Sequence, residues 1–321
     1  MALWAGIDEA GYGPRLGPLV VAGTVFNVTK EPSDGTLWDL LGDAVARRAR
    51  GSDGRLVVND SKLVYSRSLG LRRLEEGVLA FLQTRADRPL RRADQVLALL
   101  GGGAGDALGA WFRPTADLAL PVASNASSLN SKASVLRQAL RRAGVELLAA
   151  RAAVVFPPEF NRLVARTRNK SLLLFQKCGL VLQEVWKHAG PDRSFVLVDK
   201  HGARKRYRRL LLDVFPHCRC DVMQEEAHRS VYRVSDGAQR SLVVIFQEGG
   251  DTRTLPTALA SMTAKYVREL YMLAFNVYWQ QRLTDLEPTA GYHGDAQRFL
   301  RDIAPALHTE KVDLSRLVRN C

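Results

Sequence analysis

The sequence predicts an α/β protein built on a mixed β-sheet that is flanked by helices. Two observations predict this class. Short apolar segments of strand length are followed by longer segments in which apolar residues recur at helical spacing. Strand-like segments come first, and strands and helices then alternate along the chain. With 321 residues, of which 46% are hydrophobic, the chain can bury a sizeable core.

The first quarter of the chain is predicted to begin with two buried strands, over 2–7 (ALWAGI) and 19–26 (LVVAGTVF), joined by a Gly- and Pro-rich turn. A helical pattern over 36–50 follows. The segment NDSK, 59–62, has the character of a helix cap, and the helix that it starts is predicted to end near Thr84.

The character of the sequence changes between residues 86 and 146, where Gly, Ala and Ser are frequent and periodicity is weak. We interpret this segment as an inserted subdomain or lid of loops and short helices, ending in a basic helix near 131–143. Long irregular insertions are usually functional or mobile.

Regular patterning returns after the insertion. The remaining segments are predicted as strands over 145–156, 194–198, 219–223, 229–234 and 241–246, and as helices over 161–188, 202–215, 255–279 and 294–303. Residues 283–321 are then a C-terminal helical extension of the main domain.

Net charge, cysteine content and the length of apolar runs narrow the classes of function and the cellular location that we expect for the protein. Lys and Arg exceed Asp and Glu by 13, which favours a nucleic-acid partner, although a solvated Arg-rich surface has the same composition. The Cys218–Cys220 pair beside His217 lacks the second cysteine pair of a zinc site, so ordinary reduced thiols are favoured. We expect a cytoplasmic protein, because there is no apolar run of about 18 residues and no basic segment before the first apolar stretch.

Acidic residues end, or closely follow, three of the predicted strands. They are Asp8 with Glu9, Asp199, and Asp251. Carboxylates held at strand ends by a rigid sheet could converge on two divalent metal ions about 4 Å apart, as in phosphoryl-transfer enzymes. Magnesium needs oxygen ligands and no His or Cys. The alternative, that each acid is a turn or helix-cap residue, is left open by the spacing alone.

Five segments resemble motifs of the type 2 ribonuclease H family, the ribonucleases HII and HIII. In chain order they are GIDEAGYGPRLGPLVVAG (6–23), NDSKL (59–63), FVLVDKHG (195–202), GGDTRTLPTALASMTAKYVREL (249–270) and GYHGDAQRFL (291–300). The first and fourth are specific, whereas Asp-Ser-Lys alone is weak. The motifs span most of the chain apart from roughly 86–146.

The resemblance implies a ribonuclease H-like fold in which 1–321 is a single catalytic domain. It implies a site of Asp8, Glu9, Asp199 and Asp251 that binds two Mg²⁺ or Mn²⁺ ions. Family members cleave the RNA strand of RNA–DNA hybrids, and the HII branch also nicks duplex DNA on the 5′ side of a lone ribonucleotide. The expected partner is therefore a hybrid or a ribonucleotide-containing duplex, bound by a monomer.

The resemblance also implies the residues that contact the substrate. The backbone of Gly11, Tyr12 and Gly13 would read the ribose 2′-hydroxyl, because glycine lets the chain approach a sugar closely. Tyr292 would pack on the sugar at the ribonucleotide–DNA junction, although a half-buried turn aromatic is the alternative. Phosphate contacts would come from Ser61, Lys62, Ser261 and Lys265.

Three positions depart from the family pattern. Gln297 stands where the family has a histidine a few residues beyond the Gly-Tyr pair. Tyr12 replaces the usual Arg or Thr and could alter substrate choice, and Lys200 replaces a usual Gly and would place a cation beside the metal site. Two other readings stay open: a nuclease of the same fold with another structured nucleic acid as its target, and a non-catalytic hybrid-binding homologue. Binding alone would not require four repelling carboxylates.

Overall fold

A computed structural model of the chain describes residues 2–29, 36–48, 54–66, 68–102, 109–237 and 239–320. Its centre is a seven-stranded sheet in the order β5-β2-β1-β6-β9-β8-β7. The strands are β1 (Ala2–Ala10), β2 (Leu19–Val28), β5 (Val145–Val155), β6 (Ser194–Asp199), β7 (Arg219–Glu225), β8 (Arg229–Ser235) and β9 (Ser241–Gln247). β1, β6 and β9 run parallel, and the other neighbours are antiparallel. The predicted mixed sheet flanked by helices is confirmed.

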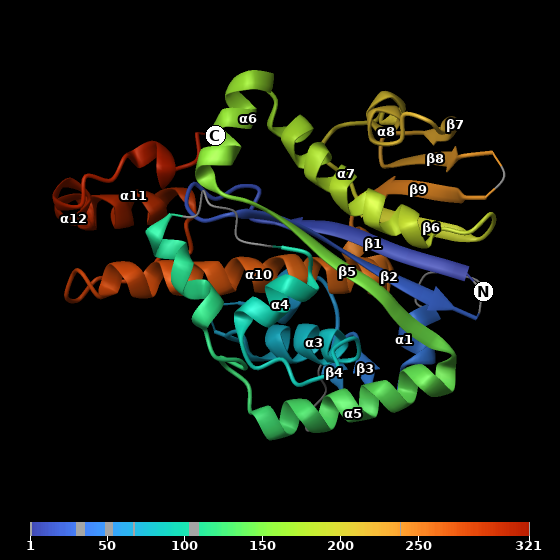
Figure 1. The fold of residues 1–321 in the computed structure, drawn as a ribbon, viewed down its shortest axis with the longest axis horizontal. Helices are drawn as coiled ribbons and strands as arrows, with labels where there is room; N and C mark the ends of the chain where they lie inside the picture. The colour runs from blue at the N-terminus through green and yellow to red at the C-terminus, as the bar shows by residue number, and fades with distance from the viewer. Residues whose placement is uncertain are drawn as a thin grey trace.

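Helices cover both faces of this sheet (Figure 1). One face carries the long helix α10 (Leu255–Gln280), with α3 (Arg72–Gln83), α4 (Ala93–Leu99) and α5 (Ala126–Ala143). The other carries α7 (Lys170–His188), with α6 (Pro157–Thr167) and α8 (Arg208–Val214). Each layer has its own cluster of buried apolar side chains. The sheet is therefore the rigid middle layer on which a site can be built.

The remaining elements are short or lie at the margins. They are α1 (Thr36–Leu40), β3 (Val45–Ala46), β4 (Leu56–Val57), α2 (Ser61–Val64), the 3₁₀ helices η1 (Ala110–Asp117) and η2 (Leu314–Arg316), α9 (Gly250–Arg253), α11 (His293–Asp302) and α12 (Ala304–Thr309). Figure 1 shows α11 and α12 beside the C-terminal part of α10. In the part of the chain described, no helix combines the length and apolarity that crossing a membrane requires.

Helix α10 packs directly on the backbone of β1 at Gly6. A Cβ atom there would lie only 2.1 Å from the Thr257 nitrogen. Next to this contact, the Thr24 hydroxyl on β2 donates a 2.8 Å hydrogen bond to the Pro256 carbonyl. The absence of a side chain at Gly6 therefore lets the start of α10 lie against the neighbouring strands β1 and β2.

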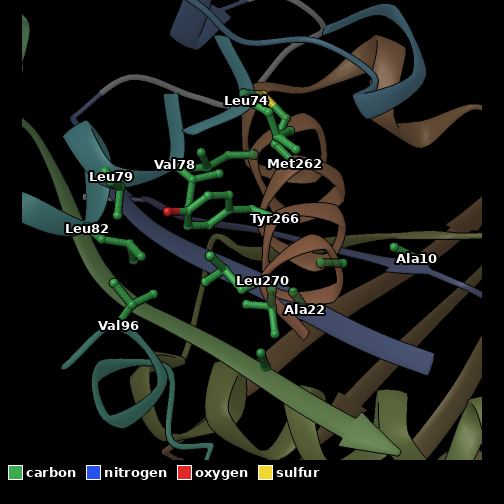
Figure 2. Close-up of a cluster of buried hydrophobic side chains, with 14 of the residues drawn as sticks. Ala10, Ala22, Leu74, Val78, Leu79, Leu82, Val96, Met262, Tyr266 and Leu270 are labelled. Carbon is green, nitrogen blue, oxygen red and sulfur yellow. The ribbon is translucent and has the colours of Figure 1, made fainter. Parts of the chain in front are cut away.

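The buried carboxylate of Glu75 joins α3, α10 and the segment before α5. It accepts hydrogen bonds from the backbone amides of Val122, Ala123 and Ser124 at 2.7–2.8 Å, and from the Tyr266 hydroxyl at 3.0 Å. The ring of Tyr266 lies among the apolar side chains of α3 and α10 (Figure 2). Much of the segment 86–146 thus packs into the same core layer as α10.

Four predicted helices differ from the structure. The helix predicted over 36–50 ends at Leu40, and the chain then turns into β3; residues 49 and 50 of that prediction lie outside the described residues. Its apolar spacing comes from burial in the core rather than from a helix, since Leu37, Leu41 and Val45 are all buried. The helix predicted from 59 to 84 is two helices, α2 and α3.

The helix predicted over 161–188 is interrupted, because Arg168 adopts a left-handed conformation (φ 49°) that ends α6. Asn169 then caps α7 by accepting a hydrogen bond from the Leu172 amide. Asparagine is a preferred N-cap residue, so the sequence does contain a signal for this helix start. The basic helix predicted over 202–215 is shorter, because only 208–214 are helical. Its first residues form a loop beside the end of β6.

Candidate metal centre and substrate groove

The register of the parallel strands brings the first three acids together. Ile7 on β1 pairs with Val198 on β6, so the next residues, Asp8 and Asp199, stand side by side where the strands end. Carboxylate oxygens of Asp8, Glu9 and Asp199 all lie within 4.8 Å of one another. Within the described residues, this is the group of acidic, His or Cys side chains close enough to share a metal ion.

The fourth predicted acid, Asp251, lies in α9, just beyond the end of β9, and is not part of this tight group. Its charge nevertheless raises the pKa of both Asp8 and Glu9, so it faces the same centre. Its own carboxyl is hydrogen-bonded to Asp60, the residue that caps α2. Asp60 is an acidic neighbour of the site that the strand-end pattern does not indicate, although it precedes Ser61 in the Asp-Ser-Lys segment.

Burial and mutual repulsion make these carboxyls hard to ionise. Burial is the main cause in every case, and the neighbouring acids add to it at Asp8, Glu9 and Asp251. The pKa of Asp8 is raised well above its ordinary value, that of Glu9 is raised to about 7, and that of Asp251 to about 7. The pKa of Asp199 is raised less, because the Gly250 amide donates a 3.2 Å hydrogen bond to its Oδ1.

The donor set fits a hard divalent cation. It consists of carboxylate oxygens held where two inner strands of a rigid sheet end, and a positive charge would relieve the repulsion between these carboxylates. The ammonium of Lys62 already lowers the pKa of Glu9, Asp199 and Asp251, but it is a single charge among several carboxylates. Asp8, Glu9 and Asp199 are therefore the residues that would hold a metal ion, with Asp251 close by.

A groove of about 620 Å³ opens beside Glu9. Most of the predicted substrate residues line it: Gly11, Tyr12, Gly13, Ser61, Lys62, Lys265 and Tyr292. They come from four separate stretches of sequence, so the fold has collected them. Tyr292 is 54% exposed, which leaves its ring accessible from the groove.

Ser261 is the one predicted substrate residue that does not line the groove. It is 2% exposed, and its hydroxyl is 3.1 Å from that of Ser61. A hydrogen bond from Ser261 also lowers the pKa of Asp8. Ser261 is therefore a buried hydroxyl next to Ser61 and Asp8 and does not face the groove.

Lys265 lines the groove while its ammonium is held in place. Its Nζ lies 2.5 Å from Glu269 Oε1 and 4.5 Å from the centre of the Tyr65 ring. The Tyr65 hydroxyl donates to the other Glu269 oxygen at 3.0 Å. This arrangement fixes the ammonium of Lys265 at the groove wall.

The ring of Tyr12 packs toward the α7 side of the sheet, against the apolar cluster of that layer. The Lys170 ammonium at the start of α7 lies 4.4 Å from the centre of the ring. A cation over an aromatic face is attracted to it. The side chain that departs from the family pattern is thus anchored at one edge of the groove.

Lys200 does not direct its charge at the acids, in contrast to the expectation from sequence. Its side chain is 2% exposed and forms an ion pair with Glu248 at 3.1 Å, and it also donates to the Ala227 carbonyl. Glu248 in turn contacts the His228 imidazole at 2.8 Å. The physical reason is that Lys200 is the first residue after β6, and its ion pair with Glu248 holds the ammonium away from the acids.

Some arginines of the basic segment 204–209, which follows β6, are already hydrogen-bonded within the protein, so only part of this segment is available to bind a nucleic-acid backbone. Arg204 donates to the Ser171 hydroxyl at 3.2–3.3 Å, and Arg208 donates to the Cys220 carbonyl. Lys205 and Arg209 are exposed.

Comparisons with known proteins find likeness at the level of structure. No family model matches the chain, and no curated protein matches it. The chain is similar to the ribonuclease HII of Archaeoglobus fulgidus, solved in a PCNA complex: 15% identity, TM-score 0.41, covering 98% of this chain and 93% of that one. It is also similar to the ribonuclease H2 of Pyrococcus horikoshii OT3, with 16% identity, TM-score 0.46, and coverage of 98% and 92%.

A third similar structure is Bst-RNase HIII, solved in complex with Mn²⁺, with 11% identity and a TM-score of 0.42. The alignment covers 99% of this chain and 66% of that one. These three structures are ribonucleases H of types HII and HIII, the family that the sequence motifs resemble. The TM-score of each of the three alignments is below 0.5.

Proposed function

We propose that the protein is a metal-dependent endoribonuclease. Its substrates would be RNA–DNA hybrids, in which it hydrolyses the RNA strand, and duplex DNA with an embedded ribonucleotide, which it nicks on the 5′ side. The observation that carries this proposal is the convergence of Asp8, Glu9 and Asp199 within 4.8 Å, at one end of a groove lined by the Gly11–Gly13 loop. Unsupported carboxylates in such a position are costly, and a nuclease would have a use for them.

The acidic centre would hold two divalent ions, Mg²⁺ or Mn²⁺. Ions bound there would supply the Lewis-acid chemistry and charge neutralisation of phosphodiester hydrolysis. The chain's own contribution is rigidity: Asp8 and Asp199 are fixed by strand register, and Asp199 also by the Gly250 amide. Asp251 is the fourth acid of the proposed centre.

Substrate recognition in this proposal divides between ribose and phosphate. The Gly11–Gly13 backbone and the exposed Tyr292 ring lie along one groove and would contact the ribose and the neighbouring sugar. Lys62 and Lys265 line the same groove and would contact phosphates, with the Ser61 hydroxyl beside them. Ser261 would support the site through Asp8 rather than touch the substrate.

The domain organisation follows the same proposal. Residues 1–321 would form one catalytic domain in which 283–321 supply Tyr292 to the groove. The segment 86–146 would act mainly as support for α3 and α10, because Glu75 ties residues 122–124 to that layer.

The test is a cleavage assay with Mg²⁺ or Mn²⁺ and three labelled duplexes: all-DNA, a full RNA–DNA hybrid, and DNA with one ribonucleotide. We expect cleavage of the last two and a product that ends in a 3′-hydroxyl. Cleavage of none of them, together with tight hybrid binding, would favour a non-catalytic hybrid-binding protein. Cleavage of a branched all-DNA control alone would favour a nuclease with a different target.

A further inference from the structure

The loop that lines the groove is held from one side by Arg319, a fully buried arginine. Its Nη1 donates to the Gly11 carbonyl at 2.7 Å, and its Nη2 donates to the Pro14 carbonyl. The two carbonyls flank Tyr12 and Gly13. One guanidinium therefore fixes both ends of the stretch that faces the groove.

The backbone around Arg319 is itself fastened at both edges. Its amide donates to the Arg15 carbonyl at 2.8 Å, and Val318 forms a bridge with Leu16. On the other edge, the Asn161 side chain on α6 donates to the Val318 carbonyl at 2.8 Å and accepts from the Asn320 amide at 2.7 Å. Residues 315–320, which we call the clasp, thus lie between α6 and the groove loop.

A second buried arginine holds the same loop from the α10 side. Arg268 is 1% exposed, and its Nη2 donates to the carbonyls of Leu16 and Ala290 at 3.2 and 2.9 Å. A Cβ on Gly11 would lie 2.8 Å from Arg268. Gly11 also has a φ of 83°, so this position favours glycine both in conformation and in space. Arg268 therefore joins the groove loop to the turn that carries Tyr292.

Burying a guanidinium is costly, and an apolar side chain could fill the same space at lower cost. Arginine is distinguished by five N–H donors in a rigid planar fork, which can fix several carbonyls at once. The carbonyls that Arg319 fixes belong to the loop on which proposed ribose recognition depends. Fixing such a loop before binding lowers the entropic cost of recognition.

We propose that Arg319 is a positioning residue for ribonucleotide recognition, which it serves by locking the Gly11–Pro14 loop against the clasp. The inference rests on the proposed function for its substrate. It also predicts a conformational effect that does not depend on activity. Replacing the guanidinium of Arg319 should loosen this loop and reduce the preference for ribose over deoxyribose.

The experiment compares Arg319→Lys and Arg319→Met with Arg316→Gln, an exposed neighbour in η2, as the matched control. Hydrogen exchange is measured across the chain. Affinity for all-DNA and single-ribonucleotide duplexes is measured in an Asp199→Asn background that does not cut. We expect exchange of the 11–17 amides to rise at least tenfold in Arg319→Met, with β9 and α7 unchanged. We expect the affinity ratio between the duplexes to fall at least fivefold, with Arg319→Lys intermediate.

Two results would overturn the proposal: unchanged exchange at 11–17, or faster exchange throughout the chain with an unchanged affinity ratio. If Arg319→Met does not fold, Asn161→Ala tests the same clasp with the arginine retained, and should raise exchange at 11–17 by a smaller factor. A wild-type protein that neither prefers nor cuts ribonucleotides would refute the proposed function. The exchange result would then still decide whether Arg319 locks the loop.

Discussion

Asp8 and Asp199 stand at neighbouring positions where two parallel strands end, and their carboxylate oxygens lie within 4.8 Å of each other. They are 191 residues apart in sequence (199 − 8). The parallel pairing of β1 with β6 is what brings them together.

Asp199→Asn should abolish cleavage of the single-ribonucleotide duplex, by about 10³-fold or more, while the affinity for the duplex stays within about threefold. The substitution keeps the shape and removes the charge that would hold a metal ion. Single-turnover cleavage and a binding titration measure the two effects. Asp213→Asn, on the exposed side of α8, is the control and should cut normally. Normal cutting by Asp199→Asn would refute the site assignment.

Metal-free protein should lose stability as pH rises. The folded-state pKa values of Glu9 and Asp251 are about 7, against ordinary values of 4.5 and 3.8. Between these limits the folded state binds more protons than the unfolded state. The resulting stability is complete below about pH 4 and is lost as pH rises through about 7.

Urea unfolding in EDTA at pH 5 and pH 8 measures this loss, which should be on the order of 5 kcal/mol for the two carboxyls together. Adding Mn²⁺ or Mg²⁺ at pH 8 should restore stability, because the ion binds only the folded site. In Glu9→Gln the pH dependence should be flatter. Equal stability at both pH values in the wild type would contradict the crowded acidic centre.

Tyr12→Ala should weaken binding of the single-ribonucleotide duplex by about tenfold, or ~1.4 kcal/mol. The substitution removes the ring that packs against the α7 layer and under Lys170, so the loop loses an anchor. Tyr12→Phe keeps the ring and should bind like wild type. Equal weakening in both variants would mean that the hydroxyl, not the packed ring, carries the effect.

Gly6→Ala should destabilise the protein by at least about 2 kcal/mol, because the added methyl would overlap the backbone at Pro256 and Thr257. Thermal or urea unfolding measures the loss. Gly294→Ala is the matched control, since a Cβ there meets nothing within 4 Å. A Gly6→Ala protein as stable as wild type would show that α10 does not lie so close to β1.

Glu75→Gln should destabilise the protein by about 2–4 kcal/mol. Three backbone amides and the Tyr266 hydroxyl point at this carboxylate, and the amide NH₂ of glutamine would oppose them with donors of its own. Exposed Glu146→Gln should change stability by less than about 0.5 kcal/mol. Similar unfolding midpoints for the two variants would mean that the hydrogen bonds to Glu75 do not stabilise the fold.

Strands β1, β2 and β6 were predictable because each is a short apolar run, and burial on both faces leaves that signature locally. The helices over 36–50 and 161–188 were not, because apolar spacing reports burial and not backbone conformation. In the first, Leu41 and Val45 are buried beyond the end of α1. In the second, the break at Arg168 depends on a single residue's dihedral angle, which hydrophobic periodicity does not register.

The sequence by itself determined the strands, the mixed sheet, and the acids that follow strand ends, because all of these depend on neighbours along the chain. Only the tertiary structure decided which groups meet. It placed Asp251 against Asp60, turned Lys200 toward Glu248, and brought Arg319 to the Gly11 carbonyl. Such contacts join segments up to 308 residues apart, and they depend on strand order and helix packing, which no local pattern encodes.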